Sequence, residues 1–238
     1  MARDLLGSAA ELRELRTRLV KKNSGQGGRE RKILMCAGAG CIASGSLEVK
    51  RALVAHMEEA GLSLPVVETG CLGPCAQGPV MRVEPDGVFY ESVAPSDAAQ
   101  IVQEHLVRGN PVMRLAHRNT HDGKPVLRIE DNDFFRGQRK IVLRNCGLID
   151  PLNIEEYIAR DGYGAMEKAL TAMTPDEIIA EMKTSGLRGR GGAGFPTWLK
   201  WQLTAKAAGD EKFALCNADE GDPGAFMDRS VQIGRAHV

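Results

Sequence analysis

The chain has 238 residues, and its 31 Lys and Arg balance its 31 Asp and Glu, so the formal net charge is zero. This length is enough for one large domain or two small ones, each with its own core. The balanced charge argues against general nucleic-acid binding, which needs a basic surface. No apolar run approaches the roughly 20 residues of a membrane span. We therefore expect no nucleic-acid partner and a protein that is not itself membrane-spanning.

Residues 1–30 are predicted to form an N-terminal helix and a linker. The segment MARDLLGSAAELRELRTRLVKK carries charges throughout, so it lacks the apolar run of a secretory signal. Ser8 and Glu11 have the spacing of a capping box. The helix would place Leu12, Leu15 and Leu19 on one face. We expect a cytoplasmic location.

Residues 31–109 are predicted to form a first domain in which short strands and helices alternate. The expected elements are a strand over Lys32–Met35, a helix from a cap at Ser46 to Ala60, a strand over Leu64–Val67, a hairpin of Val80–Val83 and Val88–Tyr90, and a helix from a cap at Ser96 to near Gly109. The first of these helices would bury Leu47, Leu53, Val54 and Met57. This order is compatible with a small thioredoxin-like α+β unit.

Residues 110–140 are predicted to be a connector, and residues 141–230 a second domain. The connector is polar and turn-prone around a strand-like Pro125–Ile129, and Lys140–Leu143 resumes an apolar strand pattern. The clearest later helix begins at Thr174-Pro175-Asp176-Glu177, which combines a capping box with Pro in the first turn, and it stops at Gly186. A helix over Thr197–Ala208 and a strand over Lys212–Leu215 are expected to follow.

Four of the six cysteines lie close together in the first domain. Their spacing is C-x4-C, 29 intervening residues, and C-x3-C, formed by Cys36, Cys41, Cys71 and Cys75. Zinc sites favour C-x2-C pairs, whereas a [2Fe–2S] cluster needs two thiolates at each of two irons, so two loops can supply one pair each. Glycines around both pairs would allow close backbone approach and offer N–H donors. Structural zinc and four free thiols remain the alternatives at this point.

The loops that carry these cysteines, MCAGAGCIASGS and TGCLGPCAQGPVM, closely resemble the cluster loops of the thioredoxin-like [2Fe–2S] ferredoxin domain. The resemblance implies that Cys36 and Cys41 hold one iron and that Cys71 and Cys75 hold the other. The remaining cysteines, Cys146 and Cys216, have no partner at ligand spacing, and we expect each to be a buried apolar thiol.

Two further motifs lie in the second domain. Gly189-Arg190-Gly191-Gly192-Ala193-Gly194 precedes the helix expected at Thr197, and glycines there would let the backbone approach a flat ring or a phosphate. A flexible turn would have the same composition. Downstream, Asn217-Ala218-Asp219-Glu220-Gly221-Asp222 would by composition be a solvated loop. Its position after an expected strand also suits the binding of ribityl or ribose hydroxyls.

Together the two motifs closely resemble the flavin- and NADH-binding motifs of the 51 kDa flavoprotein subunit of complex I. The soluble diaphorase branch of that family, found in NAD-linked [FeFe]-hydrogenases and formate dehydrogenases, is also similar through its N-terminal ferredoxin extension. The implied fold class is α/β (α+β overall): a thioredoxin-like [2Fe–2S] domain followed by the start of a Rossmann-like FMN/NADH-binding domain. Trp198 stands where the motif commonly has a small residue.

The resemblance implies roles for individual residues in binding FMN and NAD(H). Gly189, Arg190, Gly191 and Gly192 would line the site, Phe195 would stack on the nucleotide and Lys200 would contact the cofactors. Asn217, Asp219 and Glu220 would hold FMN, with Asp222 near the nicotinamide. No catalytic side chain is expected, because hydride transfer to flavin is cofactor chemistry.

The family's sequence continues beyond the motifs seen here, to a region that binds a [4Fe–4S] cluster. We therefore expect a C-terminally truncated chain in which the second domain is incomplete and residues 231–238, which end in IGRAHV, are a non-native tail. The activity implied for the parent is NADH:acceptor oxidoreduction, passing electrons between NAD(H), FMN and iron–sulfur clusters. Its partners would be a 24 kDa-type ferredoxin subunit and a hydrogenase, formate dehydrogenase or complex I-like subunit. The alternatives are a non-catalytic [2Fe–2S] electron-transfer module and a zinc-stabilised interaction module.

Overall fold

The computed structural model describes residues 7–24, 31–209, 211–213, 215, 217, 219–225 and 228. The chain divides into two compact units. We name the one made of Arg16–Arg160 and Asp219–Val238 the sheet unit, and the one made of Met1–Leu15 and Asp161–Ala218 the helical unit. Cys216 and residues 231–238 lie outside the described residues, so the predictions made for them stay predictions.

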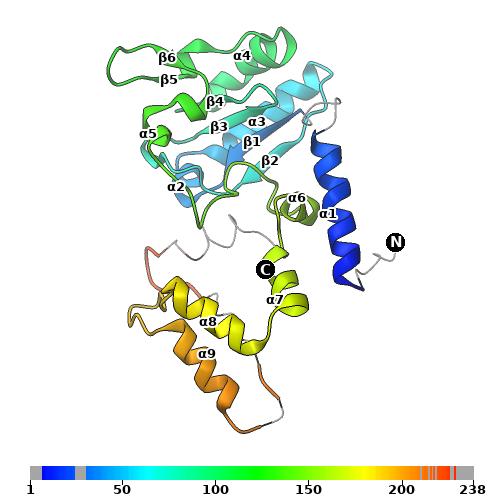
Figure 1. Cartoon of the computed structure of the whole chain (residues 1–238). Helices are drawn as coiled ribbons and strands as arrows, with labels where there is room; N and C mark the ends of the chain where they lie inside the picture. Colours follow the sequence, from blue (N-terminus) through cyan, green and yellow to red (C-terminus); the bar gives the residue numbers. More distant parts are fainter. Residues whose placement is uncertain are drawn as a thin grey trace. The chain divides into compact units, whose positions relative to one another are not determined.

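The sheet unit is built on a four-stranded mixed sheet (Figure 1). Its strands are β1 (Lys32–Cys36), β2 (Val66–Thr69), β3 (Met81–Glu84) and β4 (Val88–Tyr90). In the order β2-β1-β3-β4, β1 runs parallel to β2, with Cys36 opposite Thr69, and the other two pairings are antiparallel. A parallel neighbour requires a long crossover, which α3 (Ser46–Glu59) provides.

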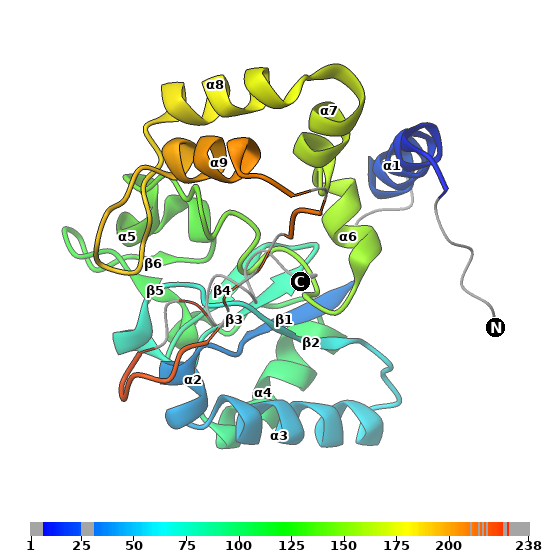
Figure 2. The ribbon, with the colours of Figure 1, turned by 90° about the horizontal axis from the view of Figure 1, so that it is seen from below.

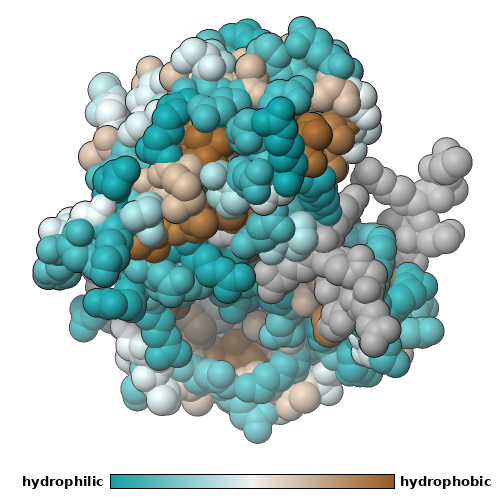
Figure 3. Space-filling model, turned by 90° about the horizontal axis from the view of Figure 1, so that it is seen from above, coloured by the Kyte–Doolittle hydropathy of each residue, from teal (hydrophilic) through white to brown (hydrophobic). Residues whose placement is uncertain are grey.

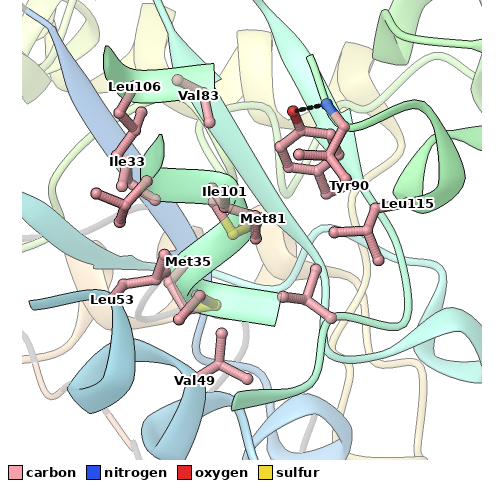
Figure 4. Close-up of a cluster of buried hydrophobic side chains, with 14 of the residues drawn as sticks. Ile33, Met35, Val49, Leu53, Met81, Val83, Tyr90, Ile101, Leu106 and Leu115 are labelled. Carbon is pink, nitrogen blue, oxygen red and sulfur yellow. Dashed lines mark hydrogen bonds between the residues drawn. The ribbon is translucent and has the colours of Figure 1, made fainter. Parts of the chain in front are cut away.

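One face of the sheet packs against α3 and α4 (Ala98–Gln100), and α4 continues as a π-helical turn over Ile101–Val107 (Figure 2). Because side chains alternate between the faces of a strand, Ile33, Met35, Met81 and Val83 all contribute to this core. Figure 4 shows them packed with residues that include Val49, Leu53, Tyr90, Ile101, Leu106 and Leu115.

A chain of hydrogen bonds borders this core. Tyr90 Oη accepts from the Val112 N–H at 2.8 Å, the bond dashed in Figure 4, and it lies 2.8 Å from His105 Nδ1. The imidazole Nε2 lies 3.1 Å from Asp86 Oδ2. Burial raises the pKa of Tyr90 to about 12. Burial also lowers the pKa of His105, and Asp86 opposes that shift.

Residues 110–160, which include the predicted connector, belong to the sheet unit. They contain the small hairpin of β5 (His117–Arg118) and β6 (Pro125–Val126), α5 (Asp133–Arg136) and α6 (Ile154–Ala159). Lys32 Nζ, at the start of β1, lies 2.7 Å from Glu156 Oε1 and so ties α6 to the sheet. Glu156 Oε2 also accepts from the Asp150 N–H at 3.0 Å, which ties α6 to the loop before it. Short 3-10 turns complete the unit at Cys75–Gln77, Pro95–Asp97, Met113–Leu115 and Ile129–Asp131.

The described elements of the helical unit are helices. They are α7 (Gly164–Ala172), α8 (Pro175–Ser185) and α9 (Thr197–Lys206), together with the first part of α1 (Ala9–Ser24). The predicted capping box is confirmed, since Thr174 Oγ1 accepts from the Glu177 N–H and the Glu177 carboxylate accepts from the Thr174 N–H. Gly186 ends α8 in the left-handed conformation, as predicted. Lys183 Nζ lies 4.8 Å from the Trp198 ring centroid, so Trp198 is a contact between α8 and α9.

Several local predictions were wrong. Gly45, at φ 95°, and not Ser46, caps α3, because Ser46 is already buried inside its first turn. Ser96 also caps nothing, since the turn starts one residue earlier at Pro95 and Asp97 accepts from the Ala94 N–H. Lys140–Leu143 is not a strand: Ile141 lies in a bend and Val142 and Leu143 lie in a turn, and no strand of the described sheet pairs with the segment.

Other element boundaries moved by a residue or two. β2 begins at Val66, two residues late, because Pro65 only offers its carbonyl to the Ile33 N–H, at 2.9 Å. Of Lys212–Leu215, residues 212, 213 and 215 are described and form no strand, and residue 214 lies outside the described set.

No helix among the described residues combines the length and the apolarity that crossing a membrane requires. Seen from above, polar and charged side chains cover most of the surface, and the apolar ones form separate patches (Figure 3).

Candidate functional site: a four-cysteine centre and a glycine loop

The parallel pairing of β1 with β2 brings the two cysteine loops to one edge of the sheet. Cys36 is the last residue of β1, and Cys71 follows β2 by two residues. Since the carboxyl ends of parallel strands meet at the same edge, both loops leave the sheet side by side. The Ala37 N–H bonds the Thr69 carbonyl at 2.9 Å and so holds the two exits together. Cys41 lies in α2 (Ala39–Ala43) and Cys75 opens a 3-10 turn.

The four predicted ligand thiols form one continuous row. Neighbouring side chains in the row interact in the pairs Cys75–Cys71, Cys71–Cys36 and Cys36–Cys41. Within the described residues, no group of three or more His, Cys, Asp or Glu side chains has an arrangement that could hold a single metal ion. A row of four thiols does match the ligand count of a two-iron cluster, which takes two thiolates at each iron.

Burial and mutual hydrogen bonding shift the pKa values of these thiols in different directions. The hydrogen bond between the two side chains raises the pKa of Cys36 and lowers the pKa of Cys41. The hydrogen bond with Cys36 raises the pKa of Cys71 strongly, whereas burial is the main cause of the raised pKa of Cys75. Four adjacent thiolates repel one another, so full ionisation of the row requires a positive group among them.

Each of the four sulfurs has a backbone N–H group beside it. The N–H of Leu72 bonds Cys36, that of Gly73 bonds Cys71, that of Val80 bonds Cys41, and Cys75 is bonded by its own N–H. Such donors stabilise negative charge on sulfur. The loops therefore supply amide donors to the sulfurs, although only one of the four comes from a glycine.

Three glycines lie directly against the cysteines of the opposite pair. A Cβ on Gly38 would lie 3.3 Å from Cys71 Sγ, and one on Gly40 would lie 3.4 Å from Cys75 Cβ. On Gly78 it would lie 3.0 Å from Cys41 Sγ and 3.2 Å from the Cys75 carbonyl. A side chain at Gly38 or Gly78 would require the neighbouring cysteine atoms to shift, whereas a Cβ on Gly40 would be in ordinary contact. The donor set and its surroundings therefore fit a compact group bound by both pairs.

A cover over the Cys71 loop was missed from the sequence. It comes from residues 129–149: Phe135 packs with Leu72 and Phe89, and the N–H of Gly147 bonds Thr69 Oγ1 at 3.0 Å. Lys140 Nζ donates to the Leu72 carbonyl at 3.1 Å. Burial lowers the pKa of Lys140, and Cys146, Cys71 and Cys36 oppose that shift. The two hydrogen bonds join residues 68 and 78 positions apart, so no local sequence motif predicts them.

Cys146 is buried in this cover, as predicted, and burial raises its pKa to about 11. It is thus a neutral thiol near the row and is not part of the hydrogen-bonded chain.

The glycine-rich loop of the helical unit is closed at its base and open at its tip. The Gly189 N–H bonds the Phe195 carbonyl at 2.8 Å, and Arg188 Nη1 bonds the Gly194 carbonyl at 3.1 Å. No heavy atom lies within 4 Å of a Cβ built on Gly191 or Gly192. Arg190, Phe195 and Lys200 are exposed. The tip therefore leaves backbone accessible to a flat ligand.

The acidic loop is also exposed where it is described. Asn217, Asp219 and Asp222 are exposed and Glu220 is half-buried. Glu220 Oε1 accepts from the Asp228 N–H at 2.7 Å. The division between the units falls at Ala218 and Asp219, so the glycine loop and the acids from Asp219 onward belong to different units.

Two segments of the chain match the sequence models of known families. Residues 23–106 match the sequence model of the thioredoxin-like [2Fe–2S] ferredoxin family, and residues 182–238 match that of the Nuo51 FMN-binding domain.

Several proteins of known sequence are similar to part of the chain. The NADP-reducing hydrogenase subunit HndC of Solidesulfovibrio fructosivorans is 55% identical over 100 residues, which is 42% of this chain and 20% of the relative. An NADH-quinone oxidoreductase subunit of Rhizobium meliloti is 53% identical over 97 residues, or 41% of this chain and 23% of the relative. The matched segment thus spans about a fifth of these relatives' length.

Among solved structures, the thioredoxin-like [2Fe–2S] ferredoxin from Aquifex aeolicus is 33% identical, with a TM-score of 0.33, over 36% of this chain and 88% of the ferredoxin. The NAD⁺-reducing [NiFe]-hydrogenase in the H₂-reduced state is 23% identical, with a TM-score of 0.33, over 94% of this chain and 38% of the hydrogenase chain.

Proposed function

Because the chain joins a thioredoxin-like [2Fe–2S] ferredoxin domain to sequence of the Nuo51 FMN-binding family, we propose that it holds a [2Fe–2S] cluster and serves in NAD(P)H-linked electron transfer through FMN. The observation that carries the proposal is the row of four cysteine thiols enclosed by glycines. Cys36 and Cys41 bind one iron, and Cys71 and Cys75 bind the other. When bound, the cluster supplies one-electron transfer.

The chain's own residues have three tasks at this centre. The ends of β1 and β2 fix the spacing of the two loops, and Gly38, Gly40 and Gly78 keep the pairs close. The N–H groups of residues 72, 73 and 80 stabilise negative charge on sulfur. The exposed Cys75 marks the side from which an electron partner reaches the centre.

The glycine loop and the acidic loop are the proposed contacts of FMN and NAD(H). Gly189, Arg190, Gly191 and Gly192 line the site, Phe195 stacks on the nucleotide and Lys200 meets the cofactors. Asn217, Asp219 and Glu220 hold FMN, and Asp222 lies toward the nicotinamide. The open tip of the glycine loop supports this proposal, since the protein's part in hydride transfer is to bring two rings face to face.

The proposed reaction is NADH:acceptor oxidoreduction, and its partners are other iron–sulfur subunits. A 24 kDa-type ferredoxin subunit and a hydrogenase, formate dehydrogenase or complex I-like subunit are the proposed classes. The relatives' own names support an assembly, because they are described as subunits. The five cysteines of the described residues are free thiols, which suits the proposed cytoplasmic location.

Metal analysis with one matched pair of variants tests the cluster. After anoxic reconstitution with iron and sulfide, we expect two irons and two sulfides per chain. Cys41→Ser should reduce that content several-fold, whereas Cys146→Ala, which removes a buried cysteine outside the row, should keep it. One zinc without sulfide would contradict the proposal and support the zinc-stabilised module.

A second candidate is a non-catalytic [2Fe–2S] module, because the complete cysteine centre belongs to the sheet unit alone. FMN titration of the cluster-loaded chain separates the two functions. Quenching of flavin fluorescence supports the flavoprotein, and its absence supports the module.

A further inference from the structure

One peptide group lies between a cation and a cysteine sulfur of the centre. The carbonyl of Leu72 accepts a hydrogen bond from Lys140 Nζ at 3.1 Å. The N–H of the same peptide belongs to Gly73 and donates to the sulfur of Cys71. The ammonium, the peptide and the sulfur therefore form a continuous hydrogen-bonded relay.

The positive charge of Lys140 has a defined effect on the hydrogen bond that the peptide donates to the sulfur. A cation bound to a carbonyl oxygen polarises the peptide and strengthens the hydrogen bond that its N–H donates, because bonds in a chain reinforce one another. Hydrogen bonds to the sulfurs and nearby charge are two of the factors that set the potential of an iron–sulfur cluster. Reduction adds one negative charge to the cluster, so both effects favour the reduced form.

The cover of the Cys71 loop holds the relay in place from both ends. Lys140 is half-buried and lies 5.1 Å from the Phe135 ring centroid, so its position is restricted by packing. A Cβ on Gly147 would lie 1.9 Å from Leu72 Cδ2, which shows how closely the cover presses on the leucine. Thr69 Oγ1 donates to the Ile149 carbonyl at 3.0 Å and accepts from the Gly147 N–H, which anchors this stretch to the end of β2.

The conformation of the relay also depends on Gly73. Its φ is +116°, which L side chains rarely adopt, and a Cβ there would lie 3.3 Å from the Phe134 ring. The backbone can therefore turn the peptide N–H toward Cys71 while Phe134 packs against the same loop.

We propose that Lys140, acting through the Leu72–Gly73 peptide, is a positioning residue that raises the reduction potential of the cluster bound by Cys36, Cys41, Cys71 and Cys75. This inference rests on the proposed cluster, and it adds that residues beyond the ferredoxin-family match, which ends at residue 106, help set the potential. The cover thus serves electron transfer as well as stability.

Redox titration of the reconstituted full chain tests the inference. Lys140→Met should lower the equilibrium constant for reduction about tenfold, which is about 59 mV for a one-electron couple. Lys140→Gln, which keeps a donor but loses the charge, should also shift to a more negative potential. Lys140→Arg should stay within about threefold of the parent, because the charge and the donor both remain. Arg139→Met removes an exposed neighbouring cation and should leave the potential unchanged.

The outcomes separate the two proposals. A parent chain that takes up no iron and sulfide contradicts the proposed function. A loaded Lys140→Met chain with the parent's potential overturns the role of Lys140 and leaves the cluster proposal standing. If Lys140→Met fails to load, equal potentials for Lys140→Gln and Lys140→Arg overturn the role instead. The electron paramagnetic resonance spectrum of the reduced cluster should change with Lys140→Met and Lys140→Gln and not with Arg139→Met.

Discussion

The cysteine centre and the glycine loop are both rich in glycine, but glycine has opposite surroundings in the two places. In the centre, a Cβ on Gly78 would lie 3.0 Å from Cys41 Sγ, so the glycine is required by atoms already present. In the loop, a Cβ on Gly191 meets no heavy atom within 4 Å. The fold of the sheet unit completes the cysteine centre. The glycine loop instead exposes backbone, and the contacts of that backbone depend on the ligand that binds there. Motif composition alone does not distinguish these cases.

The largest expected effect comes from making the same substitution in both places. Gly78→Ala should reduce the iron and sulfide content of the reconstituted chain several-fold, because the new methyl group meets Cys41 Sγ and the Cys75 carbonyl. Gly191→Ala should keep the full content and instead weaken FMN binding, followed by flavin fluorescence. The control is Gly137→Ala, which has open space around it and an ordinary φ of −92°. Equal cluster content in Gly78→Ala and Gly137→Ala would break the comparison.

A smaller effect is expected from acid, and it should act on the sheet unit. Burial lowers the pKa of His105 below its ordinary 6.5, so the unfolded chain takes up this proton first as the pH falls. The contribution of neutral His105 to stability is therefore full above pH 6.5 and is lost progressively below it. Asp86 opposes the shift and Arg31 adds to it.

Urea unfolding at about pH 7.5 and at about pH 5.5 measures this dependence. Cluster absorbance follows the sheet unit, and fluorescence follows the helical unit, because both tryptophans, Trp198 and Trp201, lie in α9. The loss of stability in acid should be smaller in His105→Gln than in the parent. His121→Gln, at an exposed position, is the control. An unchanged pH dependence in His105→Gln would contradict the expected contribution of His105.

The smallest effect concerns the helix before the glycine loop. Thr174→Ala removes the side-chain cap of α8 and should destabilise the helical unit by about 1 kcal/mol. Thr184→Ala is the matched control, because Thr184 lies inside the same helix and bonds only the Ala180 carbonyl. Tryptophan fluorescence should report the change in Thr174→Ala, and cluster absorbance should not. A parallel shift of both signals would show that the two units unfold together.

Short sequence patterns correctly predicted the elements that depend on interactions between residues close in the chain. The box at Thr174 and Glu177, the stop at Gly186 and the hairpin of β3 and β4 all follow from residues within a few positions of one another. The same holds for β1, whose apolar run is continuous. The helix cap predicted at Ser46 was wrong by one residue, because Ser46 is buried inside the first turn of α3 and Gly45 is the cap.

The apolar run at Lys140–Leu143 shows the limit of this reasoning. Its composition indicates a strand, but a strand needs an edge to pair with, and the described sheet order places β2 and β4 at the edges without pairing to it. The segment instead forms turns that carry Lys140 to the Leu72 carbonyl.

By itself, the sequence determined the identity and spacing of the four cysteines and the glycines between them, because ligand chemistry and close backbone approach depend on residue types at short range. Only the tertiary structure decided that residues 129–149 cover the Cys71 loop and that one peptide links Lys140 to Cys71. Those contacts join distant positions, and they depend on which surfaces remain uncovered once the sheet has formed. A side chain 68 residues from the peptide that it binds leaves no periodicity for a sequence pattern to detect.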